Sequence, residues 1–320
     1  MEQGQPNIAV FAATVLELAR ADPRVLVVTS DSRGSGGLET FARELPQQLV
    51  EVGIAEQNLV GLAAGLAAGG NRVFAVSPAS FLTARALEQI KNDVAYSDHP
   101  VVLVGISAGV SYGPLGATHH ATHDLAVLRA IPNITVVAPA DNLETRQATL
   151  AAASAPHPVY LRLGKRPMPN LHPAATPFRL GQAITLGSGR DVVFVACGEV
   201  VAEAVLASEL LRAEGIAVGV LSMHTVKPLD EVALLQAARV ARAVITVEEH
   251  SRYGGLGEAC AACLLERGIC VPFRLLGLPD EPTHAGSQTQ VLAHYALDAA
   301  GLARTARECL PSQRSAEGTA

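Results

Sequence analysis

The sequence predicts an α/β protein of two domains, each with a parallel β-sheet covered by helices. Short runs rich in valine and isoleucine alternate with alanine- and leucine-rich stretches of helical periodicity along most of the 320 residues. The expected strands are apolar almost throughout, which is typical of parallel sheets buried on both faces. A stretch rich in proline and polar residues, 163–178, interrupts the alternation. We therefore expect domains at 1–165 and 181–308, with a linker at 166–180 between them.

The expected elements follow one another in the order that such domains require. In the first domain we expect strands at 24–31, 74–78, 99–107 and 133–141, and helices at 7–21, 56–70, 84–97 and 143–155. In the second we expect strands at 191–198, 216–230 (with a turn), 243–250 and 271–280, and helices at 199–215, 232–242 and 255–268. The strand at 271–280 is expected to be the last. The small, polar tail 309–320 is expected to be disordered.

Composition excludes several classes of function. The net charge of −6, the 4% aromatic content and the absence of tryptophan argue against a nucleic-acid-binding surface. The N-terminal residues lack the pattern of a signal peptide, and no apolar stretch is long enough to span a membrane. The five cysteines are scattered and odd in number, which favours a reduced cytoplasmic protein.

Glu56 is the most unusual charged residue of the chain. It follows Ile54 and Ala55 and precedes a helix built almost wholly from alanine, leucine and glycine. An ordinary carboxylate at a helix N-terminus is one interpretation. In apolar surroundings, however, a carboxylate persists if it is protonated or if it binds a group that needs a proton or a hydrogen bond. A heterocyclic ring nitrogen is such a group.

The stretch "GATHHATHD" places His119, His120 and His123 before Asp124. A loop leading into a helix, capped by Asp124 or Thr122, explains it structurally. A metal site is suggested by the spacing of His119 and His123, but no H-E-x-x-H pattern is present and we expect no metal here. Acid–base chemistry or substrate contact in a cleft is favoured.

Three further patterns are weaker. The "CAAC" of Cys260 and Cys263 falls inside an expected helix without a second pair, so small core residues are favoured over a redox pair. The glycine-rich turn in "YGGLGEA" is typical of tight packing as well as of dinucleotide binding. The stretch "TSDSRGSGG" follows a strand end, where ligands bind in open α/β sheets, so Asp31 and Ser35 are cleft candidates.

Several of these motifs together resemble the transketolase and 1-deoxy-xylulose-5-phosphate synthase family of thiamine diphosphate enzymes. The resemblance rests on "EVGIAEQN", "GATHHATHDLAVLRAIPNITVVAPAD", "VKPLDEVALL" and "AVITVEEHSRYGGLGEA", in order over about residues 7–305. It implies that 1–165 is a pyrimidine-binding domain and 181–308 a transketolase C-terminal domain. The implied reaction is the transfer of a two-carbon ketol unit from a ketose to an aldehyde; acyl transfer after decarboxylation stays open.

The resemblance also implies roles for individual residues. Glu56 would bind nitrogen N1′ of the cofactor's aminopyrimidine ring and activate the cofactor. The other implied cofactor-binding residues are Phe81, Asp31, Ile54 and Arg85. The implied substrate-binding residues are His119, His120, Arg162, Ser35 and the residue at position 115. His119 is implied to be catalytic as well.

The sequence departs from the family pattern at the substrate site. An aspartate that contacts the donor sugar is replaced by Leu115, a phosphate-contacting histidine aligns with Ser107, and "PNIAVF" lacks the expected arginine. The polar grip on an ordinary sugar phosphate is therefore expected to be weaker.

The family's Mg²⁺–diphosphate motif, "GDG…N", is missing from this sequence. The resemblance therefore implies a partner: an N-terminal transketolase subunit that ligates Mg²⁺, in an α2β2 heterotetramer in which this chain dimerises. One alternative is the β subunit of a 2-oxo acid dehydrogenase decarboxylating component, whose activating glutamate lies in a "PISE"-like context. A non-catalytic scaffold is another.

Overall fold

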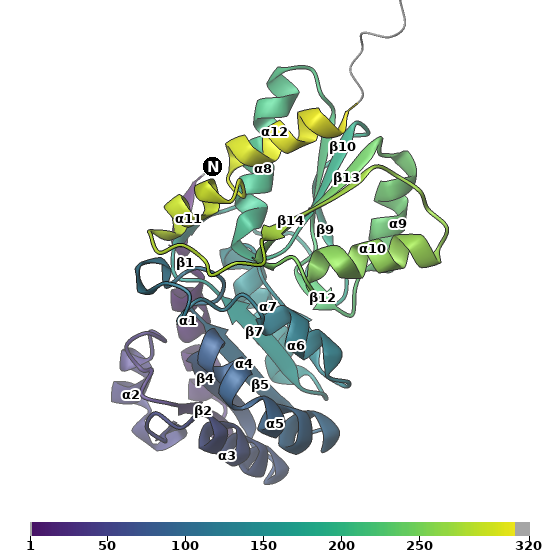
Figure 1. The fold of residues 1–320 in the computed structure, drawn as a ribbon. Coiled ribbons are helices and arrows are strands. Elements are labelled where there is room, and N and C mark those ends of the chain that lie inside the picture. Colours follow the sequence, from purple (N-terminus) through teal and green to yellow (C-terminus); the bar gives the residue numbers. More distant parts are fainter. Residues whose placement is uncertain (1, 311–320) are drawn as a thin grey trace, which may run out of the picture.

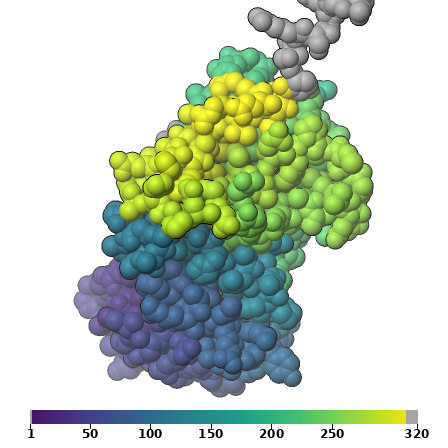
Figure 2. All heavy atoms as spheres, in the orientation of Figure 1, coloured from purple at the N-terminus to yellow at the C-terminus, as the bar shows by residue number. Residues whose placement is uncertain are grey.

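The computed structural model describes residues 2–310 and contains two α/β domains, which confirms the predicted fold class. Figure 1 shows the first domain in purple to teal and the second in green to yellow. The space-filling view shows the two domains in broad contact along the boundary between the blue and green regions (Figure 2). Within residues 2–310 we find no helix with both the length and the apolar character that crossing a bilayer requires.

The first domain is built on a seven-stranded sheet with the order β12-β6-β7-β5-β4-β2-β3. Its strands are β2 (Val25–Thr29), β3 (Leu49–Glu51), β4 (Arg72–Pro78), β5 (Val101–Ile106), β6 (Thr135–Val137), β7 (Val159–Leu163) and β12 (Thr225–Lys227). All neighbours pair in parallel except β12, which runs antiparallel to β6 and comes from the second half of the chain. Strands β3 and β7 were not predicted, and β12 joins the two halves of the chain.

Helices cover both faces of this sheet. They are α1 (Asn7–Ala21), α2 (Glu39–Glu44), η1 (Pro46–Gln48), α3 (Glu56–Ala68), α4 (Ala79–Arg85), α5 (Leu87–Gln89), the π-helical η2 (Ile90–Tyr96), η3 (Gly113–Leu115), α6 (Asp124–Ala130) and α7 (Asn142–Ser154). The single helix predicted at 84–97 was wrong. At Ala86 the backbone leaves the helical region (φ −102°, ψ 19°), and a π-helical segment follows, so the segment consists of three short pieces.

The predicted linker, 166–180, is not a free connection. Strand β8 (Pro167–Pro169) pairs antiparallel with β1 (Gln3–Pro6), and Met168 and His172 are buried. Proline removes a backbone donor, but a two-stranded ribbon has free edges that tolerate it. The linker therefore returns to the N-terminal segment and is fixed there.

The second domain is built on a five-stranded sheet with the order β14-β13-β10-β11-β9. Its elements are β9 (Ile184–Gly187), β10 (Val192–Ala196), η4 (Gly198–Val200), α8 (Val201–Ala213), β11 (Val218–Ser222), α9 (Glu231–Val240), β13 (Ala243–Ser251), α10 (Leu256–Glu266), β14 (Phe273–Leu278), α11 (Gln288–His294) and α12 (Ala299–Cys309). Only β9 is antiparallel. As predicted, β14 is the last strand.

Helices α11 and α12 were not predicted, although both carry start signals. Ser287 and Gln290 form a capping box at α11, and the Asp298 side chain caps α12. Cys309, which was expected to begin the disordered tail, ends α12; the rest of that predicted tail, from 311, lies outside the described residues.

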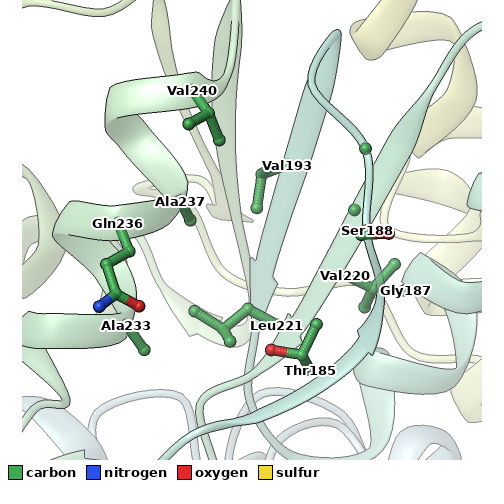
Figure 3. Close-up of a pocket in the computed structure, with 12 residues that line it drawn as sticks. Thr185, Gly187, Ser188, Val193, Val220, Leu221, Ala233, Gln236, Ala237 and Val240 are labelled. Carbon is green, nitrogen blue, oxygen red and sulfur yellow. The ribbon is translucent and has the colours of Figure 1, made fainter.

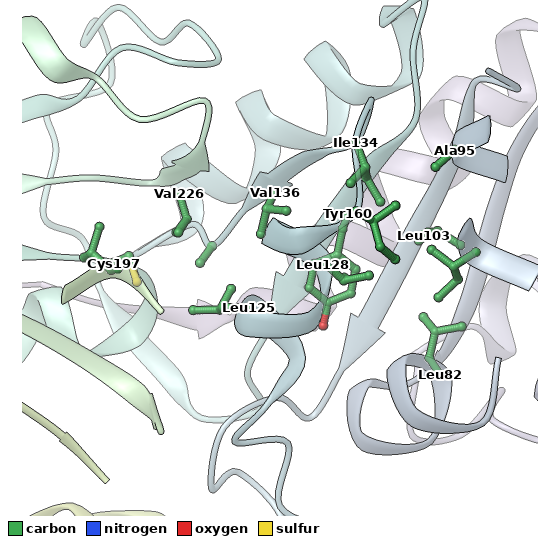
Figure 4. Close-up of a cluster of buried hydrophobic side chains, with 14 of the residues drawn as sticks. Leu82, Ala95, Leu103, Leu125, Leu128, Ile134, Val136, Tyr160, Cys197 and Val226 are labelled. Atoms are coloured by element: carbon green, nitrogen blue, oxygen red, sulfur yellow. The ribbon is translucent and has the colours of Figure 1, made fainter. Parts of the chain in front are cut away.

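The two domains share one hydrophobic core. Leu125, Leu128 and Tyr160 of the first domain belong to the same buried cluster as Cys197 and Val226 (Figure 4). All five cysteines are free, and Cys260 and Cys263 are buried on α10 in this cluster, as predicted. The burial of these side chains stabilises the contact between the domains, because each large apolar side chain removed from water contributes about 1.5–3 kcal/mol.

Candidate functional site

A cleft of about 290 Å³ lies beyond the carboxyl ends of strands β2 and β4. This is the edge at which parallel α/β sheets bind ligands. Its lining residues are Ser30, Asp31, Ser32, Ser35, Ile54, Glu56, Pro78, Phe81, Arg85, Tyr112, Leu115 and His119. Most of the residues expected from the sequence to bind cofactor or substrate are therefore brought together; their individual roles stay predictions.

Glu56 is the first residue of α3, and its side chain is only 4% exposed. Arg85, at the end of α4, donates from Nη1 to both of its carboxylate oxygens, at 3.1 and 3.2 Å. The guanidinium carbon of Arg85 also lies 4.5 Å from the centre of the Phe81 ring. The buried carboxylate thus has a partner within the chain, which the sequence did not reveal.

The part of the cleft near Asp31 is held by hydrogen bonds that involve the Glu51 carboxylate and two serine hydroxyls. Asp31 adopts a left-handed conformation (φ 52°), and its amide donates to Glu51 Oε1 at 2.6 Å. The same oxygen accepts the Gly53 amide at 3.0 Å, which joins the ends of β2 and β3. The hydroxyl groups of Ser30 and Ser77 lie 2.7 Å apart. Asp31 remains exposed and can contact a ligand.

His119 stands between two aromatic rings in the cleft. Its ring centre lies 5.3 Å from that of Phe81 and 5.8 Å from that of Tyr112, both edge to face. Its Nδ1 lies 3.0 Å from the Thr118 hydroxyl. Leu115, in η3, is 54% exposed and lines the same space. An imidazole held in this way can exchange a hydrogen bond or a proton with an oxygen in the cleft.

Two expected substrate residues are not placed in the cleft. His120 is buried, with Nδ1 2.5 Å from the Thr283 hydroxyl and Nε2 3.2 Å from the Gly113 carbonyl oxygen. Burial lowers the pKa of His120, so its ring is neutral near pH 7. Its two ring nitrogens fasten loops together and do not face the cleft.

Arg162 is also turned away from the cleft. Its Nε donates to Asp124 Oδ2 at 2.8 Å, and its Nη2 donates to the carbonyl oxygens of Ala121 and Glu249. Burial opposes the charge, but Asp124 and Glu249 outweigh it and raise the pKa of Arg162. This geometry corrects the expectation of a phosphate-binding arginine: the guanidinium ties β7 to α6 and to β13 of the second domain.

At the histidine loop the structure differs from the predicted helix cap. His123, not Asp124 or Thr122, is the N-cap of α6, and it makes no capping hydrogen bond. Its Nε2 lies 3.3 Å from the Thr83 hydroxyl. Over residues 2–310, the group of potential metal ligands does not include His119 or His123, and the absence of a metal at this loop stays a prediction.

Sequence reasoning missed Tyr112 and two cations near the cleft. The Lys165 ammonium lies 4.8 Å from the centre of the Tyr112 ring, and Arg33 pairs with Glu51 at 3.6 Å. Lys165 follows strand β7 by two residues, and Arg33 follows β2 by four. A cation just after a strand end was the signal that could have identified both.

Other concave or glycine-rich features lack comparable chemistry. A cavity of about 240 Å³ between α9 and strands β9 and β11 is lined by apolar, small or neutral side chains, such as Val193, Leu221 and Gln236 (Figure 3). At the glycine-rich turn before α10, the amides of Leu256 and Gly257 donate to the buried Glu248 carboxylate. That helix N-terminus is therefore occupied from within the chain.

Comparison with known proteins places the chain among enzymes of one family. Residues 5–170 match the transketolase pyrimidine-binding domain and residues 181–302 the transketolase C-terminal domain. The chain is 47% identical, over 93% of its length and 95% of the relative, to an apulose-4-phosphate transketolase subunit of Phocaeicola vulgatus. It is 38% identical to the 6-deoxy-6-sulfo-D-fructose transketolase subunit of a Clostridium species, over 93% and 92% of the two chains.

A solved structure agrees with this relationship. A split-gene transketolase, described as an inactive β4 tetramer, superposes with a TM-score of 0.86 at 35% identity, over 96% of this chain and 98% of that one. The two matched domain families account for both domains of the fold, and their members are transferases. The chain belongs to the transketolase family and comprises its pyrimidine-binding and C-terminal domains.

Proposed function

We propose that this chain is the C-terminal subunit of a two-subunit, thiamine diphosphate-dependent transketolase that transfers a two-carbon ketol unit from a ketose donor to an aldehyde acceptor. The observation that carries the proposal is the buried Glu56 carboxylate at the head of a cleft whose walls include Phe81 and His119. Two relatives named as subunits of transketolases support it.

The cleft fits the aminopyrimidine ring of the cofactor. Glu56 offers a buried acceptor to a protonated ring nitrogen, Phe81 offers an aromatic face, and Ile54, 74% exposed, offers an unpartnered apolar surface. When bound, thiamine diphosphate supplies the carbon nucleophile and the electron sink for carbon–carbon bond cleavage. Glu56 holds a proton at N1′, the aromatic residues exclude water, and His119 positions an oxygen of the substrate.

The diphosphate half of the cofactor, with its Mg²⁺, requires a partner subunit. Among the described residues that line the cleft, Asp31 and Glu56 are the only carboxylates, and Mg²⁺ bound to a diphosphate needs several oxygen ligands. We assign those ligands to an N-terminal subunit with a GDG…N motif and the assembly to an α2β2 heterotetramer. The structural neighbour described as an inactive β4 tetramer is consistent with a C-terminal subunit that does not act alone.

The substrate we propose is an anionic ketose of a specialised pathway. The two relatives are named after a sugar phosphate and a sulfonated sugar. In this chain Lys165 lies over the ring of Tyr112, which lines the cleft, and Arg33 follows the lining residue Ser32. Ser107, where the family pattern has a phosphate-contacting histidine, is buried at 1% exposure and does not line the cleft. Binding of the anionic group by Lys165 and Arg33 accounts for a charged substrate, as in the names of the relatives, without a contact from Ser107.

Calorimetry tests the division between subunits. The chain alone is expected to show no tight thiamine diphosphate binding with Mg²⁺, whereas its complex with the co-expressed N-terminal subunit binds the cofactor. Micromolar or tighter Mg²⁺-dependent binding by this chain alone would overturn the two-subunit proposal.

The role of Glu56 is tested in the assembled enzyme. Glu56→Gln keeps the size of the side chain but cannot hold the proton, so turnover is expected to fall by about 10²-fold or more. Glu88→Gln, on the exposed side of α5, is the matched control and should leave turnover unchanged. Equal activity of the two variants would refute the assignment, provided that gel filtration shows both assemble.

A further inference from the structure

An exposed group of potential metal-binding side chains lies in the second domain, and none of its members lines the cofactor cleft. Glu281 and His284 come from the loop after β14, and His294 is the last residue of α11. One potential ligand atom from each lies within 4.8 Å of the others. We propose that these three residues form a Zn²⁺ site, which is independent of the proposed function.

The ligand chemistry suits zinc. Two imidazoles and one carboxylate, with a fourth position left to water, form a common Zn²⁺ site with bonds of about 2.0–2.2 Å. Tetrahedral ligands at such distances are about 3.4 Å apart, so the side chains have to approach one another by roughly 1 Å. All three side chains are exposed, so neighbouring side chains leave them room to rotate toward one another. The His284 and His294 rings already lie 4.4 Å apart between centres.

The surroundings hold the ligands in place. The Tyr295 hydroxyl accepts the His284 amide at 3.2 Å. The capping box of Ser287 and Gln290 fixes the start of α11, whose Val291 and Leu292 are buried. These contacts fix the backbone from which His284 and His294 project. The partial negative charge at the end of α11 also favours a cation beside His294.

The loop of Glu281 and His284 also contacts the loop before α6, which carries the predicted substrate residues. Thr283 is hydrogen-bonded to His120, and the Gly286 amide donates to the Gly113 carbonyl oxygen at 3.2 Å. Both contacts flank the segment that contains Leu115 and His119. Zinc bound at Glu281, His284 and His294 would thus stiffen the support of that segment from the second domain.

Calorimetric titration of the tag-free chain with Zn²⁺ tests the site. We expect one equivalent to bind with micromolar affinity and to raise the melting temperature, because a ligand that binds only the folded state stabilises it. His284→Gln and His294→Gln should each weaken binding at least tenfold. His157→Gln, which removes an exposed histidine elsewhere, is the matched control and should leave binding unchanged.

Two results would contradict the site. One is the absence of saturable binding at a Zn²⁺ concentration of about 100 μM, which is well above the dissociation constant of an ordinary zinc site. The other is equal affinity in wild type, His284→Gln and His294→Gln, which would place the bound ion elsewhere. Circular dichroism of each variant tests whether a loss of binding reflects unfolding. Both substitutions are at exposed positions, so the variants are expected to fold.

Discussion

Arg85 donates from one nitrogen to both carboxylate oxygens of Glu56 and covers the ring of Phe81 with the same guanidinium. Glu56 is buried, whereas the Arg85 side chain is 52% exposed. The carboxylate is therefore compensated before any ligand arrives. If an aminopyrimidine binds in the cleft as we propose, Glu56 would exchange or share this partner, and the half-exposed Arg85 side chain would have room to move toward solvent.

A double-mutant cycle measures this pair. Arg85→Met is expected to lower the free energy of unfolding by about 1 kcal/mol, a value reduced by the exposure of the arginine. In a Glu56→Gln background the same substitution should cost much less, because the neutral amide needs no cation. Arg43→Met, an exposed arginine of α2, is the control. Equal costs in both backgrounds would mean that the pair has no coupling energy.

His172 gives the stability of this protein a defined pH dependence. It lies 2.9 Å from Asp141 and 3.2 Å from Glu144, all buried. Burial alone would lower the pKa of His172, but the hydrogen bond to Asp141 and the neighbouring Glu144 carboxylate outweigh it and raise the pKa to about 9. An unfolded histidine has a pKa of about 6.5. The stabilisation is therefore complete below about pH 6.5 and is lost as pH rises through about 9.

The variant His172→Gln tests this dependence. It leaves two buried carboxylates without their cation, so it should cost about 3 kcal/mol at pH 6. The difference in melting temperature from wild type should shrink as the pH rises from 6 to 10. His157→Gln, at an exposed ion pair, should show a small effect at every pH. A His172→Gln penalty independent of pH would contradict a charged His172.

Much of the fold follows from sequence pattern alone. Helix α1 and strand β5 lie within one or two residues of their predicted bounds, because buried strands and amphipathic helices have distinct periodicities. The pairing of strand β12 with the first sheet could not be foreseen in the same way. The strand is three residues long and its partner, β6, lies about 90 residues earlier in the chain, so only tertiary packing specifies the pairing. The buried His172 was missed because a proline-rich setting predicts a loop.

The candidate site was predictable where a residue is unusual for its setting. Glu56 stood out because a charge in an apolar run needs an explanation. Its pairing with Arg85 could not be predicted, because 29 residues separate the two in the chain. Arg162 was misplaced for the opposite reason: an arginine near a strand end is equally typical of ligand binding and of a buried ion pair, and Asp124 decides between them only in three dimensions.

The correction at Arg162 leads to a paired prediction about anion binding. Arg162→Lys loses the fork that reaches Asp124 and two carbonyl oxygens, so it should lower the free energy of unfolding by about 3 kcal/mol. Its preference for a phosphorylated over a neutral donor should not change. Lys165→Met should instead raise the KM for the phosphorylated donor and change the free energy of unfolding little. If Arg162→Lys alone reduces the donor preference, the phosphate-binding expectation was correct.

Leu115 is the residue at which donor specificity is expected to have diverged. It lines the cleft in η3, 54% exposed, and offers no hydrogen bond to a sugar hydroxyl. In the family pattern an aspartate at this place contacts the donor. A site built to bind a hydroxyl rejects ligands that lack it, because its polar group is left unpaired. Leucine removes that penalty, so the wild-type enzyme should discriminate weakly for the usual donor configuration.

Leu115→Asp in the reconstituted enzyme tests this relationship against Leu115→Ala, which removes the leucine without adding a carboxylate. A hydrogen bond to a charged group is worth about 1.5–3 kcal/mol, so Leu115→Asp should raise kcat/KM for xylulose 5-phosphate or fructose 6-phosphate by roughly tenfold or more. Leu115→Ala should give no such gain, because an open cavity offers the hydroxyl only water. A wild type that already strongly prefers these donors, and a Leu115→Asp variant that changes nothing, would show that specificity is set outside η3. A gain in Leu115→Ala as large as that in Leu115→Asp would mean that leucine acts by its bulk, since the two variants share only the loss of its side chain.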